Sequence, residues 1–178
     1  MKYSLFDQRQ LAAVAQMFNE TFTASESAEE GALIARLTLE LAALSEGPDV
    51  FGHVALDHDR IAGAIFMSRL RTGDEDDLFL LSPLGVHPEY QRQGVGRALI
   101  LAGFDCLRKM DIAVCVSYGD PDYYAASGFV SVSEDVIPAP HALSMPFGWI
   151  AASMDGNEVR PVSSPTQCVA PFDDPSLW

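Results

Sequence analysis

A stretch near the middle of the chain has residue types and a spacing that suit the binding of a phosphate group. Residues 84–97 read Leu-Gly-Val-His-Pro-Glu-Tyr-Gln-Arg-Gln-Gly-Val-Gly-Arg. This is an apolar run that leads into a polar loop and then into an amphipathic helix beginning near Gly94. The first N–H groups of a helix have no partner within it, and the helix dipole makes that end positive. The start of this helix could therefore hold an anion.

The side chains around the helix start strengthen this prediction. Gly94 and Gly96 place no side chain where an anion must approach the backbone closely, and Arg92 and Arg97 add positive charge. A Walker A loop is excluded because no Lys-Ser/Thr pair follows the glycines. A Rossmann fingerprint is excluded because the third glycine is missing and the segment lies in mid-chain. The segment favours a pyrophosphate site over a generic helix cap.

Two motifs in the chain resemble those of a known family. Gln91-x-x-Gly94-x-Gly96, preceded by Leu-x-Val-x-Pro-x-Tyr and followed by Arg-Ala-Leu, resembles the acyl-coenzyme A motif of the GNAT (GCN5-related N-acetyltransferase) superfamily. Residues 120–129 are similar to the Tyr-x-x-x-Gly-Phe element that follows the fifth strand in that family. The Gly-Asp-Pro-x-Tyr-Tyr form is similar to one branch of predicted bacterial N-acetyltransferases. The resemblance covers roughly residues 3–132.

The resemblance implies a function and a set of site residues. It implies that the protein moves the acetyl group of acetyl-coenzyme A to a primary amine by direct attack in a ternary complex. Backbone groups of Leu84 and Val86 would pair with the pantetheine arm, and an N–H near Leu84 or Gly85 would bind the developing oxyanion. The cofactor-binding residues implied in this way are Leu84, Gly85, Val86, Gln91, Arg92, Gln93, Gly94, Val95, Gly96 and Arg97.

Tyr124, four residues before Gly128, matches the tyrosine that serves as general acid in the family. A phenol with a pKa of about 10 can protonate a thiolate whose conjugate thiol has a pKa of about 8.5 when the two groups are positioned together. The alternative is that Tyr124 is an aromatic residue that only packs over the cofactor.

A general base is harder to assign. Many relatives carry a glutamate on the fourth strand, but residues 78–86 contain no acidic residue. Glu75, Asp77 and Asp120 lie nearby in the sequence, and each is better explained as a loop or capping carboxylate. A water chain, or an acceptor amine that is already neutral, would suffice.

Two other functions fit the same motifs. One is a non-catalytic acyl-coenzyme A sensor or interaction module built on the same fold, and the other is an acyltransferase for a longer acyl chain. The presence of Tyr124 favours an enzyme over a sensor. The acceptor stays open among a small amine, an aminoglycoside-like antibiotic and a protein amino group.

Hydrophobic periodicity predicts the elements that would position these residues. Ser27 and Glu30 form a capping box at the start of a helix that Gly47-Pro48 would close, after an earlier helix over residues 11–22. Strands are expected over residues 50–56, 61–68, 78–86, 112–117, 129–132 and 149–154. The order strand, helix, strand predicts a right-handed crossover between parallel strands. Pro83 cannot donate a ladder hydrogen bond, so it predicts a bulge.

The length of 178 residues suits one domain with a full core. We expect an α/β (mixed α+β) domain over residues 1–160, with a central twisted mixed sheet flanked by helices. As the resemblance implies, its parallel fourth and fifth strands would splay apart. Residues 161–178 are expected to form a proline-rich tail packed on this domain. A strand over residues 149–154 is expected at a sheet edge, where it could support a homodimer.

Composition narrows the classes of partner. A formal charge of −14 argues against a nucleic-acid surface and permits a cationic acceptor. The three cysteines and four histidines show no metal-ligand spacing, so we expect reduced cysteines and no metal. The N-terminal residues lack a secretory signal, and no apolar run is long enough to span a membrane. These features predict a cytoplasmic protein.

Overall fold

The computed structural model describes residues 1–73, 78–162 and 165–178. The chain divides into two compact units, one of residues 1–67 and 83–103 and the other of residues 68–82 and 104–178. Strands β3 and β4 and helix α3 contribute to both units. The acidic loop expected over residues 73–77 lies, except for Gly73, outside the described residues.

The strands form one seven-stranded mixed sheet in the order β1-β2-β3-β4-β5-β7-β6. Strand β4 is parallel to β5, whereas the pairs β1–β2, β5–β7 and β6–β7 are antiparallel. The mixed sheet with helices confirms the predicted fold class. The strands are β1 (Lys2–Leu5), β2 (Val50–Asp57), β3 (Arg60–Leu70), β4 (Leu78–Val86), β5 (Val114–Tyr118), β6 (Val130–Ser131) and β7 (Trp149–Ser153).

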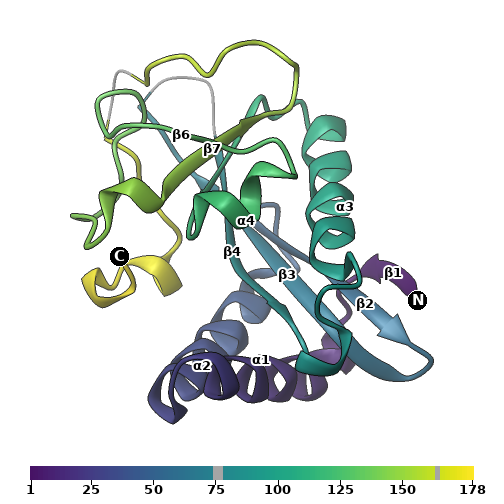
Figure 1. The fold of residues 1–178 in the computed structure, drawn as a ribbon. Helices are drawn as coiled ribbons and strands as arrows, with labels where there is room; N and C mark the ends of the chain where they lie inside the picture. The colour runs from purple at the N-terminus through teal and green to yellow at the C-terminus, as the bar shows by residue number, and fades with distance from the viewer. Residues whose placement is uncertain (74–77, 163–164) are drawn as a thin grey trace. The chain divides into compact units, whose positions relative to one another are not determined.

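The first unit contains the helices α1 (Leu11–Ser25) and α2 (Ala28–Leu44), which run side by side in Figure 1. The Ser27 hydroxyl accepts a hydrogen bond from the N–H of Glu30, which confirms the predicted start of α2. Helix α2 ends at Leu44 rather than at Gly47-Pro48, because Ser45 already caps it through its N–H and hydroxyl, both of which donate to the carbonyl of Ala42.

The core of the first unit is built from apolar side chains of α1, α2, β2, β3 and α3. Burying a large aliphatic or aromatic side chain contributes roughly 1.5–3 kcal/mol, so these residues dominate the stability of the unit. The fully buried side chains include those of Val14, Phe18, Leu41, Val54, Ile65, Phe66 and Leu99.

The second unit contains the parallel pair of β4 and β5, together with β7, β6 and the short helix α4 (Pro121–Ala125). Strand β7 lies between β5 and β6 and is paired on both sides. The expectation that residues 149–154 form an edge strand is therefore wrong, and so is the argument for a homodimer that rested on it. The strand itself was predicted correctly, because its apolar residues are buried in the sheet.

The tail packs on the second unit. Gln167 forms two backbone hydrogen bonds with Arg71, of 2.8 and 2.9 Å. Trp178 is only 5% exposed, and its indole N–H donates to the carbonyl of Phe172 at 2.9 Å. These contacts hold residues 165–178 in defined positions, although this segment contains no strand and no helix longer than a single turn.

Among the described helices, none combines the length and the apolar character needed to cross a bilayer.

Candidate acyl-coenzyme A site and active-site tyrosine

At the end of β4, one edge of the strand faces β3 and the opposite edge faces away from β3. The N–H of His87 donates to the carbonyl of Ala62 on β3 at 2.9 Å. Because successive residues of a strand point their backbone groups to opposite edges, Gly85 also faces β3, whereas Leu84 and Val86 face the other edge. The two residues predicted to pair with a pantetheine arm thus share that second edge.

Gly85 is required for packing. A Cβ at this position would lie 2.8 Å from Cδ1 of Phe18, which belongs to α1 and is fully buried. Real Cβ contacts are essentially never so short, so any larger residue would push α1 away from β4. The glycine lets α1 lie directly on the end of this strand, independently of any ligand.

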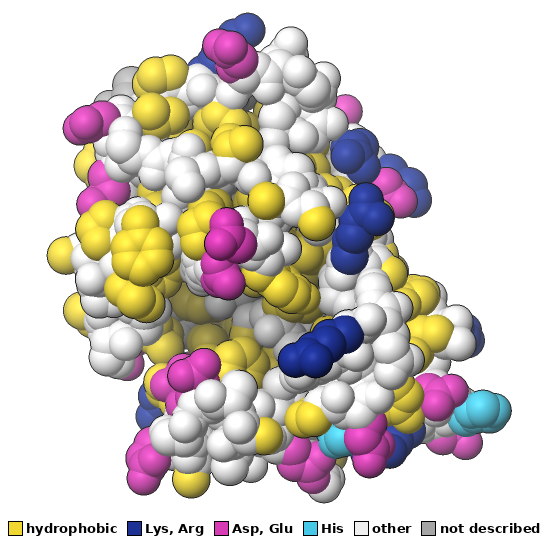
Figure 2. All heavy atoms as spheres, in the orientation of Figure 1, with side chains coloured by type: hydrophobic (Ala, Val, Ile, Leu, Met, Phe, Trp, Pro, Cys, Tyr) yellow, Lys and Arg dark blue, Asp and Glu magenta, His cyan; other side chains and the backbone are white. Residues whose placement is uncertain are grey.

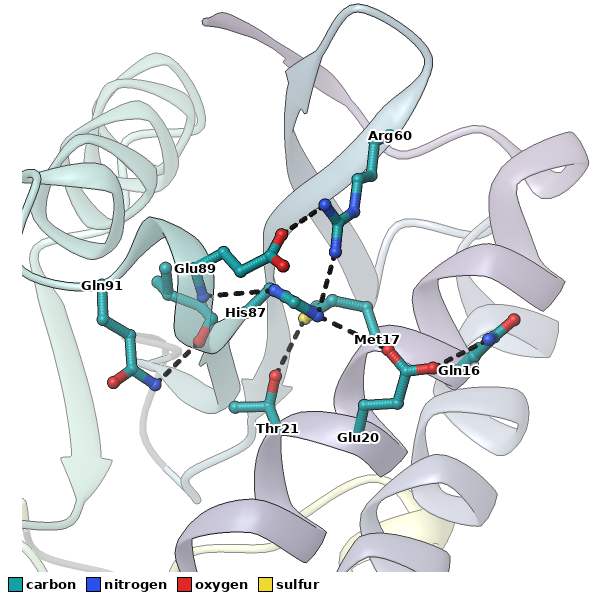
Figure 3. Close-up of polar contacts among 9 residues, drawn as sticks. Gln16, Met17, Glu20, Thr21, Arg60, His87, Glu89 and Gln91 are labelled. Carbon is teal, nitrogen blue, oxygen red and sulfur yellow. Dashed lines mark hydrogen bonds and ion pairs between the residues drawn. The ribbon is translucent and has the colours of Figure 1, made fainter.

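The loop between β4 and α3 (Val95–Lys109) is held by its own side chains. The amide of Gln91 donates to the carbonyl of Val86 at 3.0 Å, and the amide of Gln93 donates to the carbonyl of Glu89 at 2.9 Å. Figure 3 shows Gln91 reaching back to the end of the strand. Both glutamines therefore fix the shape of the loop, and the Val86 carbonyl is already hydrogen-bonded within it.

His87 anchors the same loop to the rest of the first unit. Its Nδ1 accepts a hydrogen bond from the N–H of Glu89, and its Nε2 lies 3.6 Å from a carboxylate oxygen of Glu20 on α1. Arg60 forms an ion pair with Glu89 and approaches His87 Nε2 to 3.4 Å (Figure 3). The side chain of His87 is only 13% exposed, and it anchors the loop through these contacts.

The helix start has the backbone geometry of an anion site. Gly94 has φ +79° and Arg92 has φ +59°, both in the left-handed region. The first hydrogen bond within the helix runs from Ala98 N–H to the Gly94 carbonyl at 3.0 Å. The N–H groups of Val95 and Gly96 therefore precede that bond, at the positive end of the helix dipole. No atom lies within 4 Å of the position that a Cβ on Gly94 would take.

The ten residues predicted to bind the cofactor lie together on the first unit, at the end of β4, in the following loop and in the first turn of α3. Their exposure differs. Arg92, Gly94 and Arg97 are exposed, whereas Val95 and Gly96 are buried. Tyr124 belongs to the second unit.

Tyr124 lies in α4, whose N-cap residue Asp120 accepts a hydrogen bond from the N–H of Asp122 at 3.0 Å. Its ring packs on Gly119, where a Cβ would lie 3.0 Å from Tyr124 Cε2. The ring of Phe129 meets it edge-on, with 5.3 Å between ring centroids. The ring is thereby held in one orientation by neighbours from the loop before α4 and the segment after it.

The surroundings of the Tyr124 hydroxyl keep it protonated. Burial raises the pKa of the phenol well above its usual range. A phenol in such a place is a proton donor or a hydrogen-bond donor and not an anion.

Ser117 marks the point where the pairing of β4 with β5 ends. The described register runs from Phe79 opposite Cys115 to Leu81 opposite Ser117, although β4 continues to Val86. The Ser117 hydroxyl donates to the carbonyl of Leu81 at 2.9 Å. This role could not be predicted from the sequence, because no motif or spacing distinguishes one serine in an apolar strand from any other.

The candidate bases receive no new support. Asp120 caps α4, as its alternative reading predicted, and Glu75 and Asp77 lie outside the described residues. Figure 2 shows acidic side chains dispersed over the visible face of the molecule instead of gathered in one patch.

The described structure places Cys106, Cys115 and Cys168 in no disulfide bond, in agreement with the expectation of reduced cysteines.

Comparison with known proteins agrees with these features. Residues 48–131 match the family model of the acetyltransferase (GNAT) domain. Over 110 residues the chain is 34% identical to the uncharacterised N-acetyltransferase YjhQ of Escherichia coli K12, a match that covers 61% of this chain. The chain thus spans only 56% of the length of that curated relative.

Solved structures share the fold. YhbS of Escherichia coli, solved in complex with CoA, has a TM-score of 0.81 at 20% identity, and the match covers 97% of this chain and 92% of YhbS. A GNAT acetyltransferase of Brucella melitensis, solved with acetyl-CoA, has a TM-score of 0.73 at 20% identity, covering 97% and 99% of the two chains. Residues 48–131 thus match the GNAT acetyltransferase domain, and the chain shares the fold of solved GNAT structures.

Proposed function

We propose that the protein binds acetyl-coenzyme A at the loop before α3 and transfers the acetyl group to a primary amine. The observation that carries the proposal is the left-handed turn at Gly94, which leads into α3 with the N–H groups of Val95 and Gly96 ahead of the first intrahelical bond. Such an arrangement suits a diphosphate. YhbS and the Brucella enzyme, which share the fold, were solved with CoA and acetyl-CoA respectively.

The residues at this site fit the cofactor. The space above Gly94 is open, and the side chains of Arg92 and Arg97 are exposed beside it to add positive charge. Leu84 and Val86 direct their backbone groups to one edge, as a pantetheine arm would require. Because Gln91 already occupies the Val86 carbonyl, we assign the contact at Val86 to its N–H group.

Tyr124 is proposed as the general acid. In acetyl transfer an amine nitrogen attacks the thioester carbonyl carbon, the C–S bond breaks, and the departing thiolate takes up a proton. The nitrogen, which becomes positively charged on attack, releases a proton to water, and the acid regains one from water. The phenol of Tyr124 carries a proton at neutral pH, and the ring contacts with Gly119 and Phe129 fix its direction. Of the two oxyanion donors expected, the N–H of Leu84 is proposed, because Gly85 directs its backbone groups toward β3.

No side chain among the described residues is assigned as a general base. Asp120 uses its carboxylate to cap α4, and β4 carries no acid. An acceptor amine that is neutral before it binds would need no base, and holding it against the thioester can account for about 7–11 kcal/mol of the barrier.

Release of coenzyme A from acetyl-coenzyme A, measured against a panel of amines with products identified by mass spectrometry, tests this function. We expect turnover with at least one primary amine. Tight binding of acetyl-coenzyme A without turnover of any amine would instead favour an acyl-coenzyme A sensor. Faster turnover with a longer acyl chain would favour the alternative acyltransferase.

A further inference from the structure

Three side chains with different metal-binding atoms converge in the second unit, in a part of the molecule that the proposed reaction does not use. They are His141, Cys168 and Asp173, and their donor atoms all lie within 4.8 Å of one another. His141 Nε2 and an oxygen of Asp173 are already 2.9 Å apart. The sequence predicted no metal site because these residues lie far apart in the chain and match no Cys/His spacing.

The backbone holds each of the three residues near the others. Cys168 directly follows Gln167, which is paired with Arg71 through two hydrogen bonds. Asp173 ends the single turn η4 (Ala170–Phe172), where its N–H donates to the carbonyl of Ala170 at 3.1 Å. The ring of His141 lies 6.2 Å from that of the buried Trp178. The three donor atoms could therefore close on an ion without a large rearrangement of the backbone.

Their exposure suits a bound ion that solvent can still reach. His141 is 21% exposed and Cys168 is partly buried, whereas the carboxylate of Asp173 is 71% exposed. A metal ion could enter from the side of Asp173, displace the thiol proton of Cys168 and replace the hydrogen bond between His141 and Asp173.

The donor set selects the class of ion. Thiolate and imidazole ligands suit zinc and similar transition-metal ions, whereas magnesium and calcium prefer oxygen ligands. Donor atoms that surround a zinc ion tetrahedrally lie roughly 3.3–3.6 Å apart. Side-chain movements of about 1 Å would therefore bring these three donor atoms to zinc-binding distances. We infer that His141, Cys168 and Asp173 bind a zinc-class divalent ion, with a fourth position for water or an added ligand.

Such an ion would fasten the tail to the segment before β7. Cys168 and Asp173 come from the tail, and His141 lies ahead of the turn Pro146–Gly148. An ion that binds only the folded state raises the free energy of unfolding. Zinc should therefore raise the thermal midpoint of the protein, and magnesium should not.

Cobalt(II) and zinc titrations of metal-free full-length protein test the inference. Wild type should bind one zinc ion in competition with a chromogenic chelator, and its cobalt form should show the absorption band of a thiolate-to-cobalt charge transfer. Cys168→Ser should lose this band and weaken zinc binding by about tenfold or more. The matched control Cys106→Ser, which changes another partly buried cysteine outside any disulfide, should keep both.

A second variant separates the loss of a zinc ligand from a loss of folding. Asp173→Asn changes an exposed side chain and should keep the circular dichroism spectrum of wild type while weakening zinc binding. Wild type that binds no zinc, a cobalt band that survives Cys168→Ser, or a band lost in Cys106→Ser would each overturn the inference. None of these readouts involves coenzyme A, so the test stands apart from the proposed function.

Discussion

The side-chain amide of Gln91 donates a hydrogen bond of 3.0 Å to the carbonyl oxygen of Val86, and this contact closes the loop between β4 and α3. The glutamine three residues before Gly94 therefore has a structural role: it shapes the loop. Gln91 is thus a positioning residue in the proposed site.

Gln91→Ala should weaken the binding of coenzyme A about fivefold, because one loop hydrogen bond contributes about 1 kcal/mol. Isothermal titration calorimetry measures the dissociation constant. Gln16→Ala is the control, since Gln16 is also an exposed glutamine with a side-chain hydrogen bond, here to Glu20 at 2.8 Å. An unchanged dissociation constant in Gln91→Ala would show that the loop keeps its shape without this contact.

Gly94→Ala should lower both stability and cofactor affinity. At φ +79° an alanine is strained by about 1 kcal/mol, although its Cβ would meet no atom within 4 Å. Gly156 is a matched control in the second unit, with φ +80° and an equally open surrounding. Urea unfolding should show similar losses for Gly94→Ala and Gly156→Ala, while calorimetry should show weaker coenzyme A binding only for Gly94→Ala. Equal affinity in the two variants would contradict the proposed site.

Tyr124→Phe should lower kcat by more than about tenfold while leaving the dissociation constant of coenzyme A nearly unchanged, because it removes a proton donor and keeps the ring. Tyr123→Phe is the neighbouring control; its ring is exposed and lies edge-on to that of Tyr124. Steady-state kinetics with an active amine measure both. Full turnover in Tyr124→Phe would remove this residue from the chemistry and leave it a packing role.

The pH dependence of kcat offers a separate test of Tyr124. Burial raises the pKa of its phenol, so the acid stays protonated throughout the range in which an exposed tyrosine titrates, up to at least about pH 10. We expect no loss of kcat from this group below that pH. A decline of kcat at neutral pH that disappears in Tyr124→Phe would mean that the phenol titrates far lower than its surroundings require.

Acid should weaken the turn that precedes α1. Hydrogen bonds from the side chain and the N–H of Arg9 lower the pKa of Asp7 to about 2, from a usual value of 3.8. Because the pKa is lower in the folded state, this contribution to stability is present above pH 3.8 and is lost as the pH falls to about 2. Urea unfolding at a series of pH values should show a smaller loss over this window for Asp7→Asn than for wild type. Identical pH dependence would contradict the role given to Asp7.

Local patterns predicted the elements well where the pattern and the packing agree. The strand over residues 78–86 has the predicted bounds, since nearly every residue is apolar and the strand is mostly buried. The helix predicted near Gly94 begins at Val95, because the left-handed turn at Gly94 must come before regular helical geometry starts.

Tertiary relationships could not be predicted in the same way. The position of β7 between β5 and β6 depends on strand order, which the alternation of apolar residues does not encode. The hydrogen bond of Ser117 with Leu81, the need for Gly119 beneath the ring of Tyr124 and the approach of His141 to Cys168 and Asp173 each join separate segments. Only the family motifs, which combine several local signals, pointed from sequence to function.

The central claim is that the helix start at Gly94 binds the diphosphate of coenzyme A. Calorimetric titration of the wild-type protein with coenzyme A and with pantetheine, which lacks the diphosphate and nucleotide, tests it most directly when both are repeated on Gly94→Ala. We predict that coenzyme A binds wild type far more tightly than pantetheine does, and that Gly94→Ala narrows this difference. Equal affinity for the two ligands, or no binding of coenzyme A, would contradict the claim.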